Sequence, residues 1–319
     1  MGELTRAIRE HAARLLQQDR VDVVIGFKTG TVPLRTQPAF ITEPEQATAL
    51  VHNGFCQSNL ASYLTRRPAT ERIGIICRGC ESRAVHVLVS EHQHDREQLY
   101  VIGVPCTGII DRHKIERRGE LDLEAAEVWE EGDQVIVALE DREQRYARAE
   151  VLDDACLRCA HPQPTDADLL LADLPDNGVS VDRWAPVDAF ESLPPAERFS
   201  RFAQEAERCI RCYACREACP TCYCTECFVD HNSPRWCESM VTAGGTYAWH
   251  IVRAFHQAGR CVSCGACERA CPMEIKMTYL TDKLNYDMAQ QYGFEPGMSD
   301  DATPPFAAFT LDDADRFVR

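Results

Sequence analysis

Two cysteine-rich runs constrain this chain more than any other feature of its sequence. The first run, CIRCYACREACP, begins at Cys209, and the second, CVSCGACERACP, begins at Cys261. Both runs have the spacing C-x-x-C-x-x-C-x-x-x-C-P, in which a short turn directs three thiolates at one iron–sulfur cube. In a chain with two such runs, the fourth cysteine of each run reaches the cluster of the other. The spacing therefore predicts two [4Fe–4S] clusters with exchanged ligands.

Each predicted cluster takes ligands from both runs. The first ligand set is Cys209, Cys212, Cys215 and Cys271, and the second is Cys261, Cys264, Cys267 and Cys219. Zinc sites typically show C-x-x-C pairs rather than triplets that end in Cys-Pro. Zinc and unliganded structural cysteines are therefore the weaker alternatives at these two sites.

Three further cysteines, Cys222, Cys224 and Cys227, follow the first run at short spacing. This spacing indicates an additional metal site, and a further [4Fe–4S] cluster suits it better than zinc because it would extend an electron path. The expected fourth ligand is Cys237, with Cys56 or Cys77 as alternatives. The competing interpretation is that these cysteines are spare or redox-protective thiols.

Composition limits the compartment and the partners of the chain. Its 319 residues include 18 cysteines, and the formal net charge is −16. Such acidity argues against a nucleic-acid partner and against an anionic membrane surface. No apolar run reaches the roughly 18 residues of a membrane span, and the charged N-terminus is unlike a secretion signal. We therefore expect a cytoplasmic protein without membrane insertion, whose cysteines bind metal rather than form disulfides.

The first half of the chain alternates helical and strand patterns, which is typical of an α/β domain. Apolar residues at Leu4, Ile8, Ala12 and Leu15 predict an N-terminal helix. A second helix is expected to begin at Thr42 as N-cap, and a third to follow Cys80. Strands are expected at residues 21–27, 73–77, 99–106 and 134–139.

The second half shows only helices and cysteines. A helix is expected over residues 246–258, ending at Gly259, and another from Met277 through Leu280, Leu284 and Met288 to Gly293. We expect a first domain over 1–174, a proline-rich linker over 175–197, a multi-cluster [4Fe–4S] ferredoxin domain over 198–293 and an acidic tail over 294–319. With one helix between the runs and one after them, residues 198–293 resemble the α-helical ferredoxin domains of heterodisulfide reductase and succinate dehydrogenase iron–sulfur subunits.

Three segments of the first domain resemble another family. IGIICRGCESRAV, VIGVPCTG and CLRCAHPQPTDADLLLAD follow one another as in the beta subunits of coenzyme F420-reducing hydrogenase and F420-dependent formate dehydrogenase. The resemblance covers about residues 21–173 and implies one [4Fe–4S] cluster beside FAD. It implies the ligands Cys80, Cys106, Cys156 and Cys159, and it gives Cys77 no role. Taken alone, CRGC and CLRC would instead suggest a zinc ribbon.

Flavin binding is an open alternative within this resemblance. The family has a glycine-containing, flavin-contacting segment near its N-terminus, where residues 1–18 of this chain predict a helix. The stretch KTGTVP, from Lys28, is a weak substitute for a phosphate-binding turn. We therefore expect three [4Fe–4S] clusters, with a fourth as a further hypothesis, and no tightly held FAD.

These patterns lead to three functional hypotheses. The first is an iron–sulfur electron-transfer subunit of a multi-subunit complex with a hydrogenase, formate dehydrogenase, heterodisulfide-reductase-like protein or tungsten/molybdenum oxidoreductase. A ferredoxin or flavoprotein would be a further partner. The second is a flavin-dependent oxidoreductase subunit that reduces a hydride carrier such as F420 or NAD(P), and the third is a zinc-binding interaction protein. Spacing defines no catalytic residues, while His161, His250 and His256 are expected to be cluster-tuning or surface residues rather than ligands.

Overall fold

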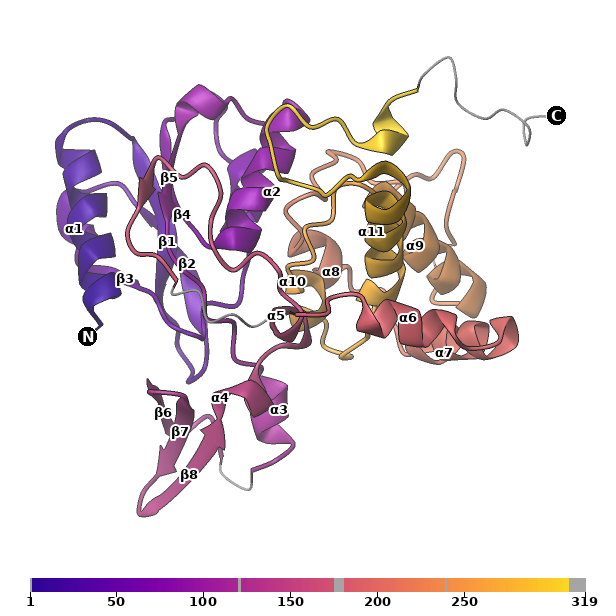
Figure 1. The fold of residues 1–319 in the computed structure, drawn as a ribbon, viewed down its shortest axis with the longest axis horizontal. Coiled ribbons are helices and arrows are strands. Elements are labelled where there is room, and N and C mark those ends of the chain that lie inside the picture. Colours follow the sequence, from indigo (N-terminus) through magenta and orange to yellow (C-terminus); the bar gives the residue numbers. More distant parts are fainter. Residues whose placement is uncertain (1, 120–121, 175–180, 239, 310–319) are drawn as a thin grey trace.

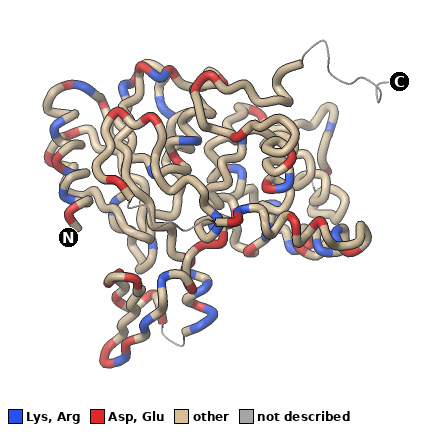
Figure 2. Tube along the Cα trace, in the orientation of Figure 1, with Lys and Arg blue, Asp and Glu red and all other residues tan. Residues whose placement is uncertain are grey.

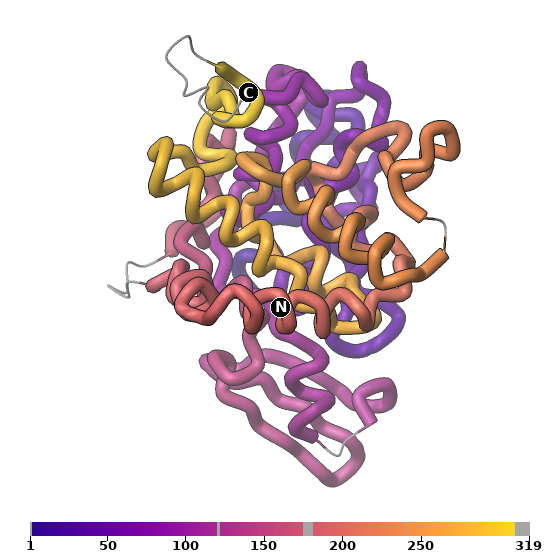
Figure 3. Tube along the Cα trace, turned by 90° about the vertical axis from the view of Figure 1, so that its right-hand side faces the viewer, coloured from indigo at the N-terminus to yellow at the C-terminus, as the bar shows by residue number. Residues whose placement is uncertain are grey.

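The chain folds into an α/β part followed by a mainly helical, cysteine-rich part, as the sequence predicts. The computed structural model describes residues 2–119, 122–174, 181–238 and 240–309. The two parts lie side by side, and a small antiparallel sheet projects beyond them (Figure 1). Viewed from the helical side, the helices of the second part lie across the front of the α/β part (Figure 3).

The core of the first part is a mixed sheet with the strand order β2-β1-β4-β5-β9. Strands β1, β4, β5 and β9 run parallel, while β2 and β3 pair antiparallel with β1. Helices α1 and α2 lie on opposite sides of this sheet (Figure 1), which explains why β4 is an unbroken apolar run. The strands are β1 Val23–Thr29, β2 Thr36–Ile41, β3 Leu50–Val51, β4 Ile73–Cys77, β5 Leu99–Gly103 and β9 Leu169–Leu170.

The helices of the first part include one correction to the sequence analysis. The helix expected from Thr42 is instead a 3-10 helix over Pro44–Ala49, and a capping box of Glu43 and Gln46 moves its start to Pro44. The N-terminal helix and the helix around Cys80 are present as expected. The helical segments are α1 Glu3–Gln17, η1 Pro44–Ala49, η2 Leu60–Arg66, α2 Gly79–Ser90, η3 Arg96–Gln98, α3 Arg112–Glu116, α4 Arg148–Val151 and α5 Asp154–Leu157.

A second, antiparallel sheet contains the strand expected at residues 134–139. That strand is β7 (Gln134–Leu139), and it lies between β6 (Glu127–Glu131) and β8 (Arg142–Ala147) rather than in the mixed sheet. Val135, Val137 and Tyr146 are buried there in a separate small core. Two tight hairpins produce this arrangement, because two residues separate β6 from β7 and two separate β7 from β8.

In the second part, helices lie between and after the cysteine runs, as expected. Helix α9 begins earlier than predicted because the Thr242 hydroxyl caps it by accepting the Gly245 N–H at 3.1 Å. Helix α11 ends at Gly293, which has a φ of 60°. The helices are α6 Ala185–Glu191, α7 Pro195–Glu207, α8 Ala214–Glu217, α9 Ala243–His256, α10 Ala266–Arg269, α11 Thr278–Tyr292 and η4 Pro305–Ala307.

Buried polar contacts join the two parts. On α2, Arg83 donates from Nε and Nη2 to the carbonyl oxygen of Pro296, at 3.0 and 2.6 Å. On α10, Arg269 donates from Nε to the carbonyl oxygen of Gln57 at 2.9 Å. The beginning of the predicted tail therefore folds back onto the α/β part.

The predicted domain boundaries stay predictions. The described portion of the expected linker contains α6 and the start of α7, while residues 175–180 and 310–319 lie outside the described residues. No helix within the described ranges is both long and apolar enough to cross a membrane. Acidic and basic residues are interspersed over both parts (Figure 2).

Candidate iron–sulfur centres

Four predicted ligands line one small pocket in the helical part. Cys209, Cys212 and Cys215 come from the first run, and Cys271 comes from the end of the second. The other lining residues are mostly apolar or aromatic: Ile210, Tyr213, Trp249, His250, Met273, Ile275 and Met277. The structure therefore brings the first predicted ligand set together across the expected exchange between runs.

The two cysteine runs fold into equivalent turns. Arg211 and Tyr213 of the first run have φ angles of 52° and 60°, and Ser263 and Gly265 stand at the same positions of the second with 52° and 70°. Each run then enters a four-residue helix, α8 or α10, which contains its third cysteine. Such turns point successive N–H groups inward, and the N–H of Arg211 donates to Cys209 Sγ at 3.3 Å.

The second predicted ligand set gathers around Cys219. Cys261, Cys264 and Cys267 each lie close enough to Cys219 to interact with its charge. Burial raises the pKa of all three thiols, and it raises that of Cys261 to about 12. Because the ligand of iron is the thiolate, iron binding at this site would require these thiols to release their protons.

Polar side chains surround Cys219 itself. The Thr221 hydroxyl lies 3.3 Å from Cys219 Sγ, and the Gln257 side-chain amide donates to Cys222 Sγ at 3.3 Å. A hydrogen bond from the Cys222 thiol, together with the nearby Arg253, lowers the pKa of Cys219 well below its usual value, although burial opposes this. Cys219 is therefore the member of its group best prepared to act as a thiolate.

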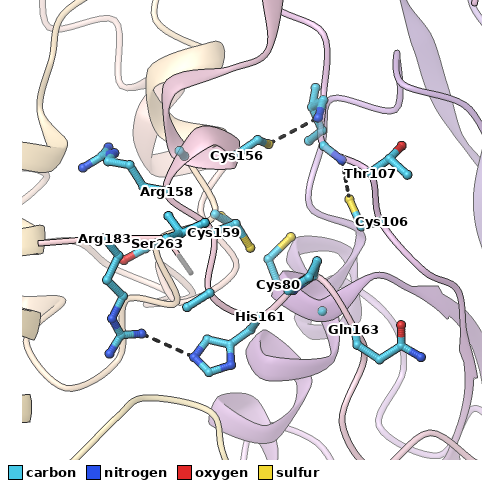
Figure 4. A pocket seen from close by; sticks show the side chains of 18 of the residues that line it. Cys80, Cys106, Thr107, Cys156, Arg158, Cys159, His161, Gln163, Arg183 and Ser263 are labelled. Atoms are coloured by element: carbon cyan, nitrogen blue, oxygen red, sulfur yellow. Dashed lines mark hydrogen bonds between the residues drawn. The ribbon is translucent and has the colours of Figure 1, made fainter. Parts of the chain in front are cut away.

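A cavity of about 1370 Å³ between the two parts contains the third cysteine set. Cys80, Cys106, Cys156 and Cys159 all line it. Figure 4 shows the sulfur atoms of Cys80 and Cys159 directed towards each other across this space. The cavity lies beyond the carboxyl ends of the parallel strands β4 and β5, where α/β sheets commonly bind ligands. The structure thus brings together the four cysteines that the family resemblance implies.

Local backbone contacts hold these thiols in place. A Cβ atom at Gly79 would lie 1.9 Å from the carbonyl oxygen of His161, so glycine allows the loop after Cys159 to pack against α2. The N–H of Gly108 donates to Cys106 Sγ at 3.3 Å (Figure 4). A second bond of this kind joins the N–H of Ile109 to Cys156 Sγ, also at 3.3 Å. N–H groups bound to sulfur stabilise negative charge there and are a known means of tuning iron–sulfur clusters.

The rest of the cavity wall combines apolar residues with arginines that pair with carboxylates. Its arginines are Arg83, Arg148, Arg158 and Arg183. Arg158 pairs with Asp282 at 2.8 Å, and the amide oxygen of Asn285 is buried without a hydrogen-bond partner among the described residues. The volume exceeds the 300–1,000 Å³ that is typical of small-molecule sites. There is accordingly room for a ligand in addition to a cluster.

The three predicted ligand sets form a continuous row. We call them the first group (Cys209, Cys212, Cys215 and Cys271), the second group (Cys219, Cys261, Cys264 and Cys267) and the third group (Cys80, Cys106, Cys156 and Cys159). Cys264 of the second group also lines the cavity, and its charge acts on Cys80 of the third group. Arg253 interacts with thiols of both the first and the second group. Cys212 of the first group is exposed at the surface. The row therefore leads from the cavity through the half-buried second group to the outside of the molecule.

The contacts of the described residues do not bring Cys222, Cys224, Cys227 and Cys237 together at one site. Cys222 contacts Cys219, and Cys224 is exposed. Cys227 and Cys237 pack with the apolar cluster around Trp249. The alternative fourth ligands, Cys56 and Cys77, are buried in the core of the α/β part. A fourth cluster stays a prediction, and among the described residues no group of three His, Cys, Asp or Glu is placed to hold a single metal ion.

Two of the three histidines singled out in the sequence, and one buried arginine, lie next to the cysteine groups. His250 lines the pocket of the first group, and its buried Nε2 has no partner among the described residues. His161 lines the cavity and contacts Glu295 at 2.7 Å, while His256 is exposed. Sequence reasoning missed Arg253 because an arginine on a helix gives no signal of burial until the packing is known.

The third cysteine group lies within a range of the chain that matches a known protein family. Residues 70–187 match the family described as the C terminus of the coenzyme F420 hydrogenase/dehydrogenase beta subunit, and this range contains all four of its cysteines. The F420-dependent formate dehydrogenase subunit beta of Methanocaldococcus jannaschii is 24% identical over 350 residues, which cover 91% of each chain. The F420-dependent formate dehydrogenase 1 subunit beta of Methanococcus maripaludis is also 24% identical, over 95% of this chain and 93% of its own.

A solved structure of the F420-reducing [NiFe] hydrogenase complex from Methanosarcina barkeri contains a similar chain. The similarity covers 49% of this chain and 62% of that one, with 15% identity and a TM-score of 0.40.

Proposed function

We propose that the chain is an electron-transfer subunit of a multi-subunit redox complex, because residues 70–187 match the coenzyme F420 hydrogenase/dehydrogenase beta-subunit family and two formate dehydrogenase beta subunits are similar over most of its length. The three cysteine groups described above, each with four cysteines, would hold one [4Fe–4S] cluster each. The continuous row of these groups, from the cavity to the exposed Cys212, is the observation that carries the proposal. Its partners would be other redox subunits, with a ferredoxin or flavoprotein as a further partner.

The residues around each cysteine group fit an iron–sulfur cluster. Each group offers four thiols, most of which are half-buried, and backbone N–H groups already donate to Cys106, Cys156 and Cys209. The unpartnered Nε2 of His250 provides a further donor at the first group. A bound [4Fe–4S] cluster supplies one-electron chemistry, with a potential set by hydrogen bonds, charge and burial. The chain's own contribution is to exclude water, direct donors at sulfur and keep the three sites adjacent.

A flavin-dependent function is the second candidate, and the cavity favours it. The space beside the third cysteine group exceeds an ordinary ligand pocket and has room for a cofactor such as FAD, while its four arginines each pair with a carboxylate of the wall. In that case the chain would itself exchange electrons with a hydride carrier such as F420 or NAD(P). The zinc-binding interaction protein finds less support, because the three groups adjoin one another as an electron path requires.

Metal analysis tests the electron-transfer proposal. Anaerobically purified protein is expected to contain about twelve irons and about twelve acid-labile sulfides per chain, since each of the three clusters has four of each. About sixteen would add the fourth cluster at the surplus cysteines. A value near eight would contradict a cluster at Cys80, Cys106, Cys156 and Cys159, and zinc without sulfide would contradict the proposal as a whole.

Flavin analysis separates the two candidates. The purified chain is expected to release no stoichiometric flavin on denaturation and to reduce neither F420 nor NAD(P) without a partner. Release of one flavin per chain, together with hydride-carrier turnover by the single chain, would replace the first candidate with the second.

A further inference from the structure

One buried arginine stands between the first and second cysteine groups. Arg253 lies on α9 and is 6% exposed. Its Nη2 donates to the carbonyl oxygen of Cys215 at 3.2 Å, and its Nη1 lies 3.9 Å from Met277 Sδ. Its Nε has no hydrogen-bond partner among the described residues.

The positive charge of Arg253 lacks a carboxylate partner in the described part of the chain. A buried guanidinium without a counter-ion is strongly unfavourable, so its balancing charge must come from other groups. The groups that interact with it electrostatically are thiols: Cys215 of the first group, Cys219 and Cys267 of the second, and Cys222. Among these thiols only Cys219 has a lowered pKa, so the negative charge that balances Arg253 would come from the Cys219 thiolate and from the thiolates that ligate bound clusters.

Arg269 provides an instructive contrast at the next step of the row. It interacts with Cys264 of the second group and Cys156 of the third, so it also lies between two groups. However, its Nη1 lies 3.4 Å from Asp153 Oδ1, and this carboxylate offsets much of its charge. Of these two arginines, only Arg253, between the first and second groups, has no carboxylate partner among the described residues.

We propose that Arg253 supplies a shared positive charge that raises the reduction potentials of the first and second clusters together. This inference rests on the proposed function, because it requires clusters at both groups. Reduction adds one electron to a cluster, and a nearby cation stabilises the reduced form more than the oxidised form. The effect is strong in a buried site, where neither water nor salt screens the charge. The four cysteines of the third group are not among the strongest electrostatic partners of Arg253, so the third cluster is expected to be affected least.

The test is a potentiometric titration of the anaerobically purified full chain, followed by electron paramagnetic resonance. Arg253→Gln is expected to lower both potentials so that, at the wild-type midpoint, the reduced-to-oxidised ratio falls at least tenfold, which is 59 mV for one electron. The third cluster, identified by loss of its signal in Cys80→Ser, is expected to show the smallest shift in potential. Arg253→Lys preserves the charge and is expected to give potentials close to wild type. The control Arg201→Gln, at an arginine whose side chain is 53% exposed on α7, removes one charge at the surface and is expected to change neither potential.

Unchanged potentials in an iron-replete Arg253→Gln protein would overturn the inference. If that variant loses iron, Arg253→Lys decides: recovery of iron and potentials supports a charge role, and failure to recover them overturns it. The wild-type protein is analysed first, and an absence of clusters there would contradict the proposed function rather than the role of Arg253.

Discussion

Single residues determine whether the cysteine turns can form. Gly265 adopts a φ of 70°, and a Cβ atom there would lie 2.7 Å from Ala155 Cβ in the first part. At the equivalent position of the first run, Tyr213 adopts the left-handed conformation with a side chain, and its ring packs on Trp249. The second turn therefore requires glycine for its contact with the α/β part as well as for its backbone.

Substitution of Gly265 tests this requirement. Gly265→Ala is expected to lower the free energy of unfolding by at least about 1–2 kcal/mol, the usual cost of the left-handed conformation for a residue with a side chain. The matched control is Gly244→Ala on α9, where no heavy atom lies within 4 Å of the added Cβ. A helical glycine replaced by alanine is expected to be neutral or to stabilise by up to about 1 kcal/mol. Denaturant unfolding measures both, and equal effects would argue against a special role for Gly265.

The ligand role of the cavity cysteines is also testable one residue at a time. Cys80→Ser is expected to remove about four irons and to leave the clusters of the first and second groups, whose ligands lie between Cys209 and Cys271. Cys77→Ala is the control, because Cys77 is buried in the core of the sheet and is expected to keep the full iron content. Iron and sulfide analysis distinguishes the two variants. Loss of iron from both in equal amounts would mean that folding, rather than ligation, is affected.

At the scale of elements, local patterns were predictable and long-range pairing was not. The apolar run of β4 matches its predicted bounds, since a buried strand between helices leaves a continuous apolar signature. The strand at residues 134–139 was also predicted, but its sheet was not, because periodicity shows that a strand is buried without showing its partner. The first two cysteine groups followed from spacing within and between the runs. The position of Arg253 could not be predicted in this way, because it depends on how α9 packs against the first and second cysteine groups.

Residues 294–300, which follow α11, are expected to be less stably folded at acidic pH. Burial would raise the pKa of Glu295, but His161, Arg183 and Arg83 outweigh burial and hold that pKa at about 2. Since the folded pKa lies below the ordinary value, the ionised carboxylate stabilises the fold at neutral pH. This stabilisation is lost as the pH falls from about 4.5 to about 2.

Hydrogen–deuterium exchange of residues 294–300 measures this effect. Glu295→Gln is expected to lower their protection at pH 7, and lowering the pH from about 5 to about 3 should bring the wild type towards the variant after correction for intrinsic rates. Glu197→Gln is the control, because Glu197 forms a half-exposed pair with Arg201 on α7. Its exchange at residues 294–300 is expected to match that of the wild type throughout. Equal protection in Glu295→Gln and wild type at pH 7 would contradict the assigned contact.

At the scale of the whole molecule, the two parts are expected to unfold together. Sequence composition predicts a linker between independent domains, whereas Arg83, Arg269 and their carbonyl partners form buried contacts across the boundary. Contacts of this kind couple the stabilities of the parts that they join. The sequence could not show this, because each contact joins residues far apart in the chain.

Removal of Arg83 tests the coupling. Arg83→Ala is expected to lower the free energy of unfolding by about 2–4 kcal/mol, because buried charge-assisted hydrogen bonds to Pro296 and Val262 are lost. In the wild type, far-ultraviolet circular dichroism and cluster absorbance should report a single transition. The exposed Arg72, paired with Asp19 and Asp22, is the control, and its replacement by alanine should change the transition little. Two separate transitions in the wild type would instead favour independent domains.

The pocket that joins Cys209, Cys212 and Cys215 to Cys271 also has a consequence for biosynthesis. During translation, the first three of these cysteines leave the ribosome well before the fourth. The first site therefore cannot close until nearly the whole second run has emerged, by which time the preceding α/β part has had time to fold. Until then, the thiols of the first run are exposed and lack Cys271, their fourth predicted ligand. Delivery of iron and sulfide to this chain is accordingly expected late, and premature oxidation of the nascent first run is the hazard that such timing creates.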